Sequence, residues 1–325
     1  MKIGIIGAGW IAEKMALSLQ AKPQDCEVYA IASRSIEKAR DFAQKWSISK
    51  AYGSYEELVS DKNVDLIYIA TPHSHHYEHT RLALEHGKPC LVEKAFMANY
   101  RQAQTVVNLS RERKVFVAEA IWTRYQPAVQ MVRQLINDGR IGTPRLITAT
   151  LGYSMGEKPR IMRPDLCGGA LLDLGVYAIN FVRMFCDSPI EQMESQCVKS
   201  ATGMDLTNAI SFTFANGMLA NVQSSACCVG DNIGVIAGTD GNLIIDNINN
   251  PQRIRVNTHD RVFVEDIPVP EQITGYEYQF IACKQALEEG LIEPPQMPLE
   301  ETLYIMKMMD ELRFKWGVRY PMDEE

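Results

Sequence analysis

The chain opens with Lys2-Ile3-Gly4-Ile5-Ile6-Gly7-Ala8-Gly9-Trp10-Ile11-Ala12, an apolar run that passes directly into a glycine-rich turn. The run predicts a buried strand, and a helix pattern begins at Trp10-Ile11. Gly7, Gly9 and Ala12 fill the small-residue positions of the G-x-G-x-x-G/A pattern, which allow a tight turn, a close pyrophosphate and close helix packing. Glycines alone could merely mark a turn. With a strand before them and a helix after them, they predict a dinucleotide bound at the helix N-terminus.

Strand and helix patterns alternate through the first part of the chain. Strands are predicted at 27–32, 64–70, 90–93 and 115–118, and helices at 36–46, 77–85 and 100–113. This alternation predicts an α/β fold with a doubly wound parallel sheet of the Rossmann type, over residues 1–121. Because ligands bind at the carboxyl ends of such strands, we expect segments 71–76, 93–96 and 119–122 to border the cofactor.

The second predicted strand ends at Ser33-Arg34-Ser35. An NAD enzyme usually places Asp or Glu ~20 residues past the glycines to bind the ribose hydroxyls, whereas Arg suits the 2′-phosphate of NADP. An isolated Arg is more often a solvated loop charge, but this position gives Arg34 a ligand to bind. Ser33 and Arg34 therefore favour NADP over NAD.

Three histidines cluster in Thr71-Pro72-His73-Ser74-His75-His76, and no carboxylate or thiolate accompanies them at a metal-ligand spacing. We therefore predict no metal site. Outside the glycine turn and Ser33-Arg34, the predicted cofactor-binding residues are Thr71, Pro72, His73, His76, Glu93 and Lys94.

The second part of the chain, residues 122–325, is predicted to be an α+β domain for substrate binding and dimerisation. Strand patterns cover 144–152, 207–215, 218–224, 234–238, 242–246 and 253–257. The turn signals Asn216-Gly217 and Asp240-Gly241 predict hairpins, and so a largely antiparallel open sheet. In 209–214, apolar residues alternate with small ones, which leaves one flat face that could pair with a second subunit in a homodimer.

The composition favours a small-molecule partner. The 325 residues include 46% hydrophobic and 22% charged residues, and the net charge is −7, which argues against nucleic acid or an anionic membrane as partner. The eight cysteines show no C-x-x-C spacing, which is typical of a reducing cytosol. We expect a cytoplasmic protein without a signal peptide or membrane-spanning run.

At Glu93-Lys94 the chain resembles a known family. Together with Gly7-Ala8-Gly9, Thr71-Pro72 and Asp173-Leu174-Gly175-Val176-Tyr177, this motif resembles the Gfo/Idh/MocA oxidoreductases over nearly the whole chain. The family's Glu-Lys-Pro motif carries a catalytic lysine, which falls on Lys94. Ala95 replaces the proline, so the loop lacks the fixed φ that proline imposes.

Three further stretches resemble one branch of that family, the dimeric dihydrodiol dehydrogenases, which includes NADP-dependent xylose dehydrogenases. They are Glu119-Ala120-Ile121-Trp122-Thr123-Arg124, Gly168-Gly169-Ala170-Leu171-Leu172-Asp173 and Trp316-Gly317-Val318. Most family members carry His four residues after Asp173, whereas this branch has Tyr, as here at Tyr177.

Asp173 and Tyr177 stand at i and i+4 on one helix face, a spacing that by itself favours a core helix with a hydrogen-bonded tyrosine. The resemblance implies instead that Lys94, Asp173 and Tyr177 are catalytic. A free tyrosine titrates near ~10, too high for a base at neutral pH. A lysine ~4 Å away contributes ~4 kcal/mol at an effective dielectric constant of ~20, which lowers the pKa by about 3 units before desolvation raises it.

The expected substrate pocket lies between the two domains, with Trp122 as an aromatic wall and Arg163 and Tyr276 as further walls. The leading hypothesis is an NADP-dependent dehydrogenase acting on a secondary alcohol of a sugar or vicinal diol. Two alternatives stay open: a dinucleotide-binding regulator without turnover, and a glycosidase that retains its nicotinamide for transient oxidation.

Overall fold

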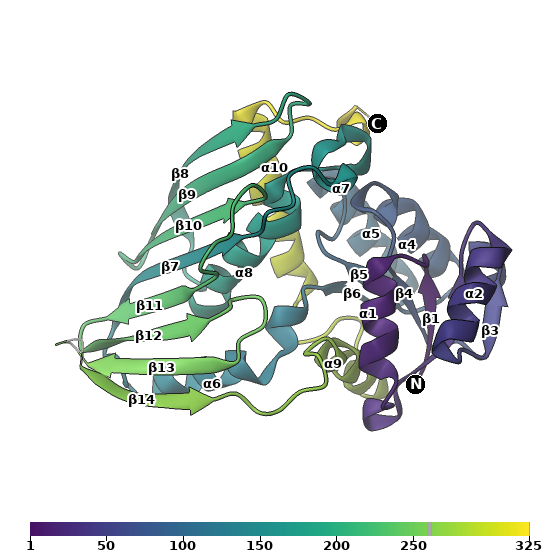
Figure 1. Ribbon diagram of the computed structural model, residues 1–325, viewed down its shortest axis with the longest axis horizontal. Coiled ribbons are helices and arrows are strands. Elements are labelled where there is room, and N and C mark those ends of the chain that lie inside the picture. Colours follow the sequence, from purple (N-terminus) through teal and green to yellow (C-terminus); the bar gives the residue numbers. More distant parts are fainter. Residues whose placement is uncertain (259, 261, 325) are drawn as a thin grey trace. The chain divides into compact units, whose positions relative to one another are not determined.

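The computed structural model describes residues 1–258, 260 and 262–324, which form two compact units (Figure 1). The first unit comprises Met1–Tyr125, Ile273–Lys307 and Met322–Glu325. The second comprises Gln126–Gln272 and Met308–Pro321. The predicted boundary after residue 121 lies close to the first crossing, but the chain later returns to the first unit.

A six-stranded parallel sheet forms the first unit, which confirms the predicted parallel sheet, although the sequence patterns missed the short strand at 50–52 and the short helix at 55–60. Its strands are β1 (Lys2–Ile6), β2 (Glu27–Ala32), β3 (Lys50–Tyr52), β4 (Leu66–Ile69), β5 (Cys90–Glu93) and β6 (Val117–Ala120), in the order β3-β2-β1-β4-β5-β6. Its helices are α1 (Trp10–Leu19), α2 (Ile36–Trp46), α3 (Tyr55–Ser60), α4 (His76–Glu85) and α5 (Tyr100–Arg113). Every residue of β4, β5 and β6 is buried, as expected for parallel strands covered on both faces.

Side-chain caps fix where three of these helices begin. Ser35, Ser54 and Asn99 accept hydrogen bonds from backbone N–H groups three residues on, at 3.3, 3.2 and 2.9 Å. Each cap satisfies a donor that the helix itself leaves free. The capped helices follow β2, β3 and β5, so each cap ends a loop that begins at the carboxyl edge of the sheet.

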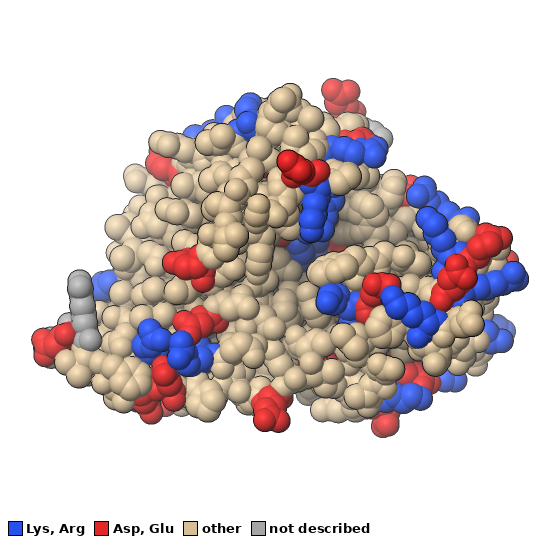
Figure 2. Space-filling view, in the orientation of Figure 1, with Lys and Arg blue, Asp and Glu red and all other residues tan. Residues whose placement is uncertain are grey.

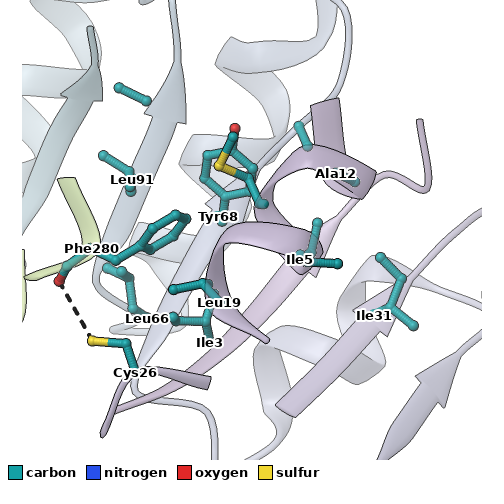
Figure 3. Packing of buried hydrophobic residues seen from close by; sticks show 14 of the residues in the cluster. Ile3, Ile5, Ala12, Leu19, Cys26, Ile31, Leu66, Tyr68, Leu91 and Phe280 are labelled. Carbon is teal, nitrogen blue, oxygen red and sulfur yellow. Dashed lines mark hydrogen bonds between the residues drawn. The ribbon is translucent and has the colours of Figure 1, made fainter. Parts of the chain in front are cut away.

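Helix α9 (Glu277–Glu288) explains why the chain returns to the first unit. Phe280, Cys283 and Ala286 belong to the same hydrophobic cluster as residues of β1 and β4 (Figure 3). The rings of Phe280 and Tyr68 meet edge to face with centroids 5.4 Å apart. The predicted single domain boundary did not include this return to the first unit. The sequence of α9 shows that the helix has an apolar face, but it does not show which part of the fold that face packs against.

The second unit contains an eight-stranded sheet in the order β14-β13-β12-β11-β7-β10-β9-β8. Its strands are β7 (Pro144–Gly152), β8 (Ile190–Lys199), β9 (Asp205–Phe214), β10 (Leu219–Ser225), β11 (Gly234–Gly238), β12 (Gly241–Asp246), β13 (Arg253–Thr258) and β14 (Phe263–Pro268). All neighbours are antiparallel except β7 and β10. The sequence patterns missed β8 and β14, the two edge strands, whose largely exposed residues lack a buried, alternating face.

Helices of the second unit are α6 (Pro127–Asn137), α7 (Pro159–Met162) and α8 (Val176–Phe185), and α10 (Leu299–Trp316) contributes its second half. Helix α8 packs on the inner face of the sheet, where a Cβ at Gly234 would lie 2.2 Å from Cζ of Phe181. The segment Pro164–Phe185 has the length and composition of a membrane span and is almost entirely buried, as a core helix is.

The outer face of this sheet carries small, polar and aliphatic side chains. It includes Thr148, Thr150, Thr207, Ala209, Ser211, Leu219, Asn221, Gln223, Val235 and Ile244. In Figure 2 the area over these strands shows few charged groups, whereas both signs are interspersed over α2. The side chains named above carry no charge.

Candidate cofactor and catalytic sites

The glycine-rich turn has the geometry that a bound pyrophosphate needs. Gly7 has φ +99°, and a Cβ there would lie 3.1 Å from the carbonyl oxygen of Ala70, so only glycine fits. A Cβ at Gly9 would meet nothing within 4 Å, so this side of the turn is open to a ligand. Ala12 is fully buried, and Trp10 is 61% exposed at the start of α1. The residues present therefore fit a dinucleotide.

A cavity of about 640 Å³ lies beside Arg34 in the first unit. Its lining includes Tyr55 from α3 and Tyr77, His79 and Arg81 from α4. Ser33, 92% buried at the end of β2, accepts a weak 3.4 Å bond from the Ser35 amide. The cavity offers the guanidinium group of Arg34 and several rings, a combination suited to a phosphorylated adenosine, whereas Arg81 is paired with Glu85 at 2.8 Å and two further glutamates line the cavity.

His79 was not predicted from the sequence to line the cofactor site, although it stands four residues after His75, the N-cap residue of α4. Its Nδ1 lies 3.1 Å from the Thr71 hydroxyl, and its ring meets Tyr55 edge to face at 4.6 Å. Burial, followed by the nearby charges of His75 and Arg34, lowers the pKa of His79 to about 4. The ring is therefore neutral at physiological pH.

Lys94 lies on the loop after β5, and both predicted histidines contact this loop. His73 Nε2 lies 3.1 Å from the Lys94 carbonyl oxygen. His76 Nδ1 lies 3.0 and 3.2 Å from the carbonyl oxygens of Ala95 and Phe96, and its Nε2 lies 2.9 Å from that of Thr71. The Lys94–Ala95 peptide bond is cis. Whether these histidines also contact the cofactor stays a prediction.

Burial and the adjacent His73 lower the pKa of His76 to about 3. A neutral imidazole has one N–H, so His76 donates to one side of its ring only. Glu93 accepts a short hydrogen bond from the Tyr68 hydroxyl and one of 3.2 Å from the Lys94 amide. Side chains thus hold the loop, although Ala95 replaces the family's proline.

A second buried carboxylate, Glu119, lies at the end of β6. It is 1% exposed, accepts a 3.1 Å hydrogen bond from the Thr302 hydroxyl and another from the Phe96 amide. Burial raises the pKa of Glu119 to about 7, although both hydrogen bonds and Arg124 oppose the shift. The Lys94 loop is therefore held from both strands that flank it.

Trp122 and Tyr276, both predicted substrate walls, stack on each other in the first unit. Their ring centroids are 3.9 Å apart with an interplanar angle of 23°. Trp122 is 5% exposed, whereas Tyr276 is half-buried, so Tyr276 covers one indole face. The structure thus makes the two predicted walls one aromatic pair.

Glu277 fixes the segment that precedes Tyr276. Its buried carboxylate accepts hydrogen bonds from the amides of Ile273, Thr274 and Gly275 at 2.7, 3.1 and 2.8 Å. Three backbone donors on one carboxylate make a rigid turn. Tyr276 therefore has a defined place against Trp122.

In the second unit, Asp173 lies in a π-turn (Leu171–Gly175) and Tyr177 in the first turn of α8. Both are more than 90% buried. Arg160 donates to Asp173 Oδ2 at 3.2 Å, an interaction that the sequence spacing did not indicate. Arg163, the third predicted wall, is exposed and paired with Asp165, and its role stays a prediction.

No three His, Cys, Asp or Glu side chains within the described part of the chain are grouped to hold a metal ion. The predicted functional groups lie on the glycine-rich turn before α1, on the loop after β5, and on the π-turn and first turn of α8. A Rossmann sheet with such groups defines the class of nicotinamide-dependent oxidoreductases.

Comparison with known proteins agrees with this class. The profile described as "Oxidoreductase family, NAD-binding Rossmann fold" matches residues 1–120, and the "GFO/IDH/MocA C-terminal domain" matches residues 129–244. The chain belongs to the Gfo/Idh/MocA oxidoreductase family.

Its relatives cover the chain from end to end. It is 33% identical to trans-1,2-dihydrobenzene-1,2-diol dehydrogenase of Mus musculus, over 100% of this chain and 99% of the relative. It is 34% identical to D-xylose 1-dehydrogenase (NADP(+)) of Hypocrea jecorina, over 99% of this chain and 93% of that relative. A 3-ketoreductase from Actinomadura kijaniata, solved with NADP and TDP-benzene, superposes with TM-score 0.85 at 25% identity over 97% of each chain. The predicted family and branch are confirmed.

The buried carboxyl of Glu119 makes stability depend on pH. Its pKa is about 7 in the folded chain against 4.5 ordinarily, so the folded state holds a proton that the unfolded state has lost between these pH values. The free energy of unfolding must then fall as pH rises through this window, by about 3 kcal/mol. We expect Glu119→Gln to remove this slope.

Urea unfolding of the whole protein at pH 5, 6, 7 and 8 checks this pH dependence. His76 and His79, whose lowered pKa values act in the opposite direction, cancel in the difference between variant and wild type. Glu300→Gln, at a side chain 73% exposed, is the control. A difference between Glu119→Gln and wild type that does not change with pH contradicts the assignment.

Proposed function

We propose that the protein is an NADP-dependent dehydrogenase that oxidises a secondary alcohol of an uncharged sugar or vicinal diol. The observation that carries the proposal is that the chain is similar from end to end to diol and xylose dehydrogenases. It also has Lys94, Asp173 and Tyr177 at the positions to which the resemblance assigns catalysis. A purified-protein screen of diols and sugars, followed by nicotinamide absorbance, tests it.

The bound cofactor would accept a hydride from the carbinol carbon. The hydroxyl proton needs an acceptor, and Tyr177 is the proposed one. Lys94, the lysine to which the family resemblance assigns catalysis, is proposed to polarise the reacting oxygen of the substrate. Arg160 orients the carboxylate of Asp173, which would accept a hydrogen bond from a neighbouring substrate hydroxyl.

Two other functions use the same fold. A regulator without turnover has no need of a lysine, an aspartate and a tyrosine all in catalytic positions. A glycosidase with retained nicotinamide would keep its cofactor through dialysis and convert substrate without net change in absorbance. The dehydrogenase should instead release its cofactor and reduce it stoichiometrically.

We propose NADP as the preferred cofactor, because Ser33 and Arg34 stand where NAD enzymes place an acid and Arg34 lines the cavity with Arg81. Arg34→Ala should weaken NADP binding about tenfold to a hundredfold, the loss of a charge-assisted hydrogen bond, and leave NAD binding nearly unchanged. Fluorescence titration with both cofactors measures this. Lys62→Ala, an exposed cation away from the cavity, is the control. Equal titration of NADP and NAD by the wild type would contradict the proposal.

Tyr177→Phe keeps the ring and removes only the proton carrier. NADPH should still bind, while turnover falls ~10²–10⁴-fold. Lys94→Met should act likewise. Steady-state rates, measured together with cofactor titration, distinguish a loss of turnover from a loss of cofactor binding. If either variant kept most of the wild-type rate, the assignment of acid and base would be wrong.

The aromatic pair suits the C–H face of a pyranose or a cyclohexadiene diol. Trp122→Ala removes the support of Tyr276 and should raise KM more than it lowers kcat. Trp122→Phe, which can still stack, is the matched variant and should lie close to wild type. A KM indifferent to Trp122→Ala, or activity confined to phosphorylated sugars, would show that this view of the substrate is mistaken.

We also propose a homodimer in which a second subunit covers the outer face of the eight-stranded sheet. A broad sheet face with few charges is more often buried in an interface than left exposed to water. Ala209→Glu, on an exposed position of β9, should give a monomer by light scattering. Ala201→Glu, in an exposed turn, should not. A monomeric wild type at micromolar concentration would refute the proposal.

A cytoplasmic location is the last part of the proposal. The eight cysteines, all within the described residues, form no disulfide, which suits a reducing compartment. Fractionation of cells expressing the natural chain tests it.

A further inference from the structure

The turn that carries Asp173 rests on a string of buried polar side chains. Asp205 at the start of β9 is fully buried, and its Oδ2 accepts hydrogen bonds from the Leu171 amide at 2.7 Å and from Asn208 Nδ2 at 2.9 Å. Asn208 Oδ1 in turn accepts from the Ser224 hydroxyl at 2.8 Å. Asn208 and Ser224 face each other across β9 and β10. The string thus spans two strands of the inner sheet face.

Asp205 and Ser224, the two ends of this string, lie next to the first and last residues of the π-turn. The Leu171 amide is the first N–H of the turn, and a Cβ on Gly175, its last residue, would lie 3.1 Å from the Ser224 hydroxyl. At Gly169, with φ +115°, a Cβ would lie 2.2 Å from Asp205 Oδ1. Glycine is therefore required where the carboxylate approaches the backbone.

The charge of Asp205 also suits this place. Burial raises the pKa of Asp205 to about 6, against hydrogen bonds from Asn208 and Leu171, so the carboxylate is ionised under ordinary assay conditions. An anion at a helix N-terminus is stabilised by the free N–H groups and the dipole of the helix. Arg313, whose charge favours the ionised form of Asp205, is fully buried and pairs with Asp310.

A second contact fixes the entry to the turn. The Tyr320 hydroxyl donates to the Gly168 carbonyl oxygen at 2.7 Å, and the Gly168 amide donates to the Arg163 carbonyl oxygen at 3.0 Å. A Cβ at Gly168 would lie 2.4 Å from the Ile161 carbonyl oxygen. The backbone before the turn has little room to move, so the bond from Leu171 to Asp205 decides where the turn itself begins.

We propose that Asp205 is a positioning residue for the reaction: through Leu171 it sets the place of the turn that presents Asp173 and Tyr177. The proposal rests on the catalytic roles given above to those two residues. A buried carboxylate is costly where an apolar side chain would pack, and the two hydrogen bonds that Asp205 Oδ2 accepts from Leu171 and Asn208 favour one geometry, while its Oδ1 is buried with no hydrogen-bond partner among the described residues. A displacement of ~1 Å at a reacting group can cost ~10²-fold in rate.

The test compares Asp205→Ala, Asp205→Asn and Asn208→Ala with wild type in kcat, KM, NADPH affinity and thermal midpoint. Asp205→Ala should lower kcat ~10- to 100-fold with NADPH affinity within twofold of wild type. Asp205→Asn keeps an acceptor for the Leu171 amide and should recover most of that loss. Asn208→Ala should lie between them. With a deuterated substrate, the isotope effect on kcat should rise in Asp205→Ala, because a misplaced base slows the chemical step.

Ile254→Ala is the matched control, since it opens a cavity on β13, which three strands separate from β10, and should lower the thermal midpoint while leaving kcat unchanged. The proposal is overturned if Asp205→Ala shows kcat within twofold of Ile254→Ala. Should Asp205→Ala not fold, the same result in Asn208→Ala overturns it. Tyr177→Phe in the same series separates the two claims. If it keeps full activity the catalytic assignment fails, whereas loss there with no loss in the Asp205 and Asn208 variants refutes only the positioning role.

Discussion

Buried backbone groups need hydrogen-bond partners, and this constraint shapes both loops that carry the proposed catalytic residues. The loop at Lys94 leaves the sheet with three carbonyl oxygens turned inward, where His73 and His76 meet them, while Glu93 and Glu119 accept from its amides. In the second unit, Asp205 accepts from the turn before Asp173. In each unit the reactive side chain sits on irregular backbone that neighbouring strands hold through polar side chains.

This arrangement explains how the chain tolerates Ala95 where its family has proline. A proline limits the backbone locally, through its own ring. Here the limits come from side chains distant in sequence, above all His76, whose neutral ring is fully buried among carbonyl oxygens. The Nε2 atom of the same histidine lies 2.9 Å from the Thr71 carbonyl oxygen, so its ring packs between the loops after β4 and β5 at the carboxyl edge of the sheet.

The sequence predicted the features that depend on local pattern. The glycine turn, the parallel sheet and the helix carrying Asp173 and Tyr177 follow from spacing, and the family from motifs. It could not predict contacts made across the fold: Arg160 on Asp173, Tyr276 on Trp122, or α9 returning to the first core. The edge strands β8 and β14 were missed for a related reason, since their exposed residues carry no alternating apolar pattern. For His79 the sequence did carry a signal, because its spacing of four residues from His75 places both rings on one side of a helix.

The central claim is that this chain moves a hydride directly between a carbinol carbon and nicotinamide. A sugar or diol substrate deuterated at the reacting carbon, incubated with NADP and the purified protein, tests it by mass spectrometry of the recovered cofactor. The account predicts one deuterium in each NADPH formed, in proportion to product. Unlabelled reduced cofactor, with the deuterium found in solvent, or product formed without any reduced cofactor, would contradict it.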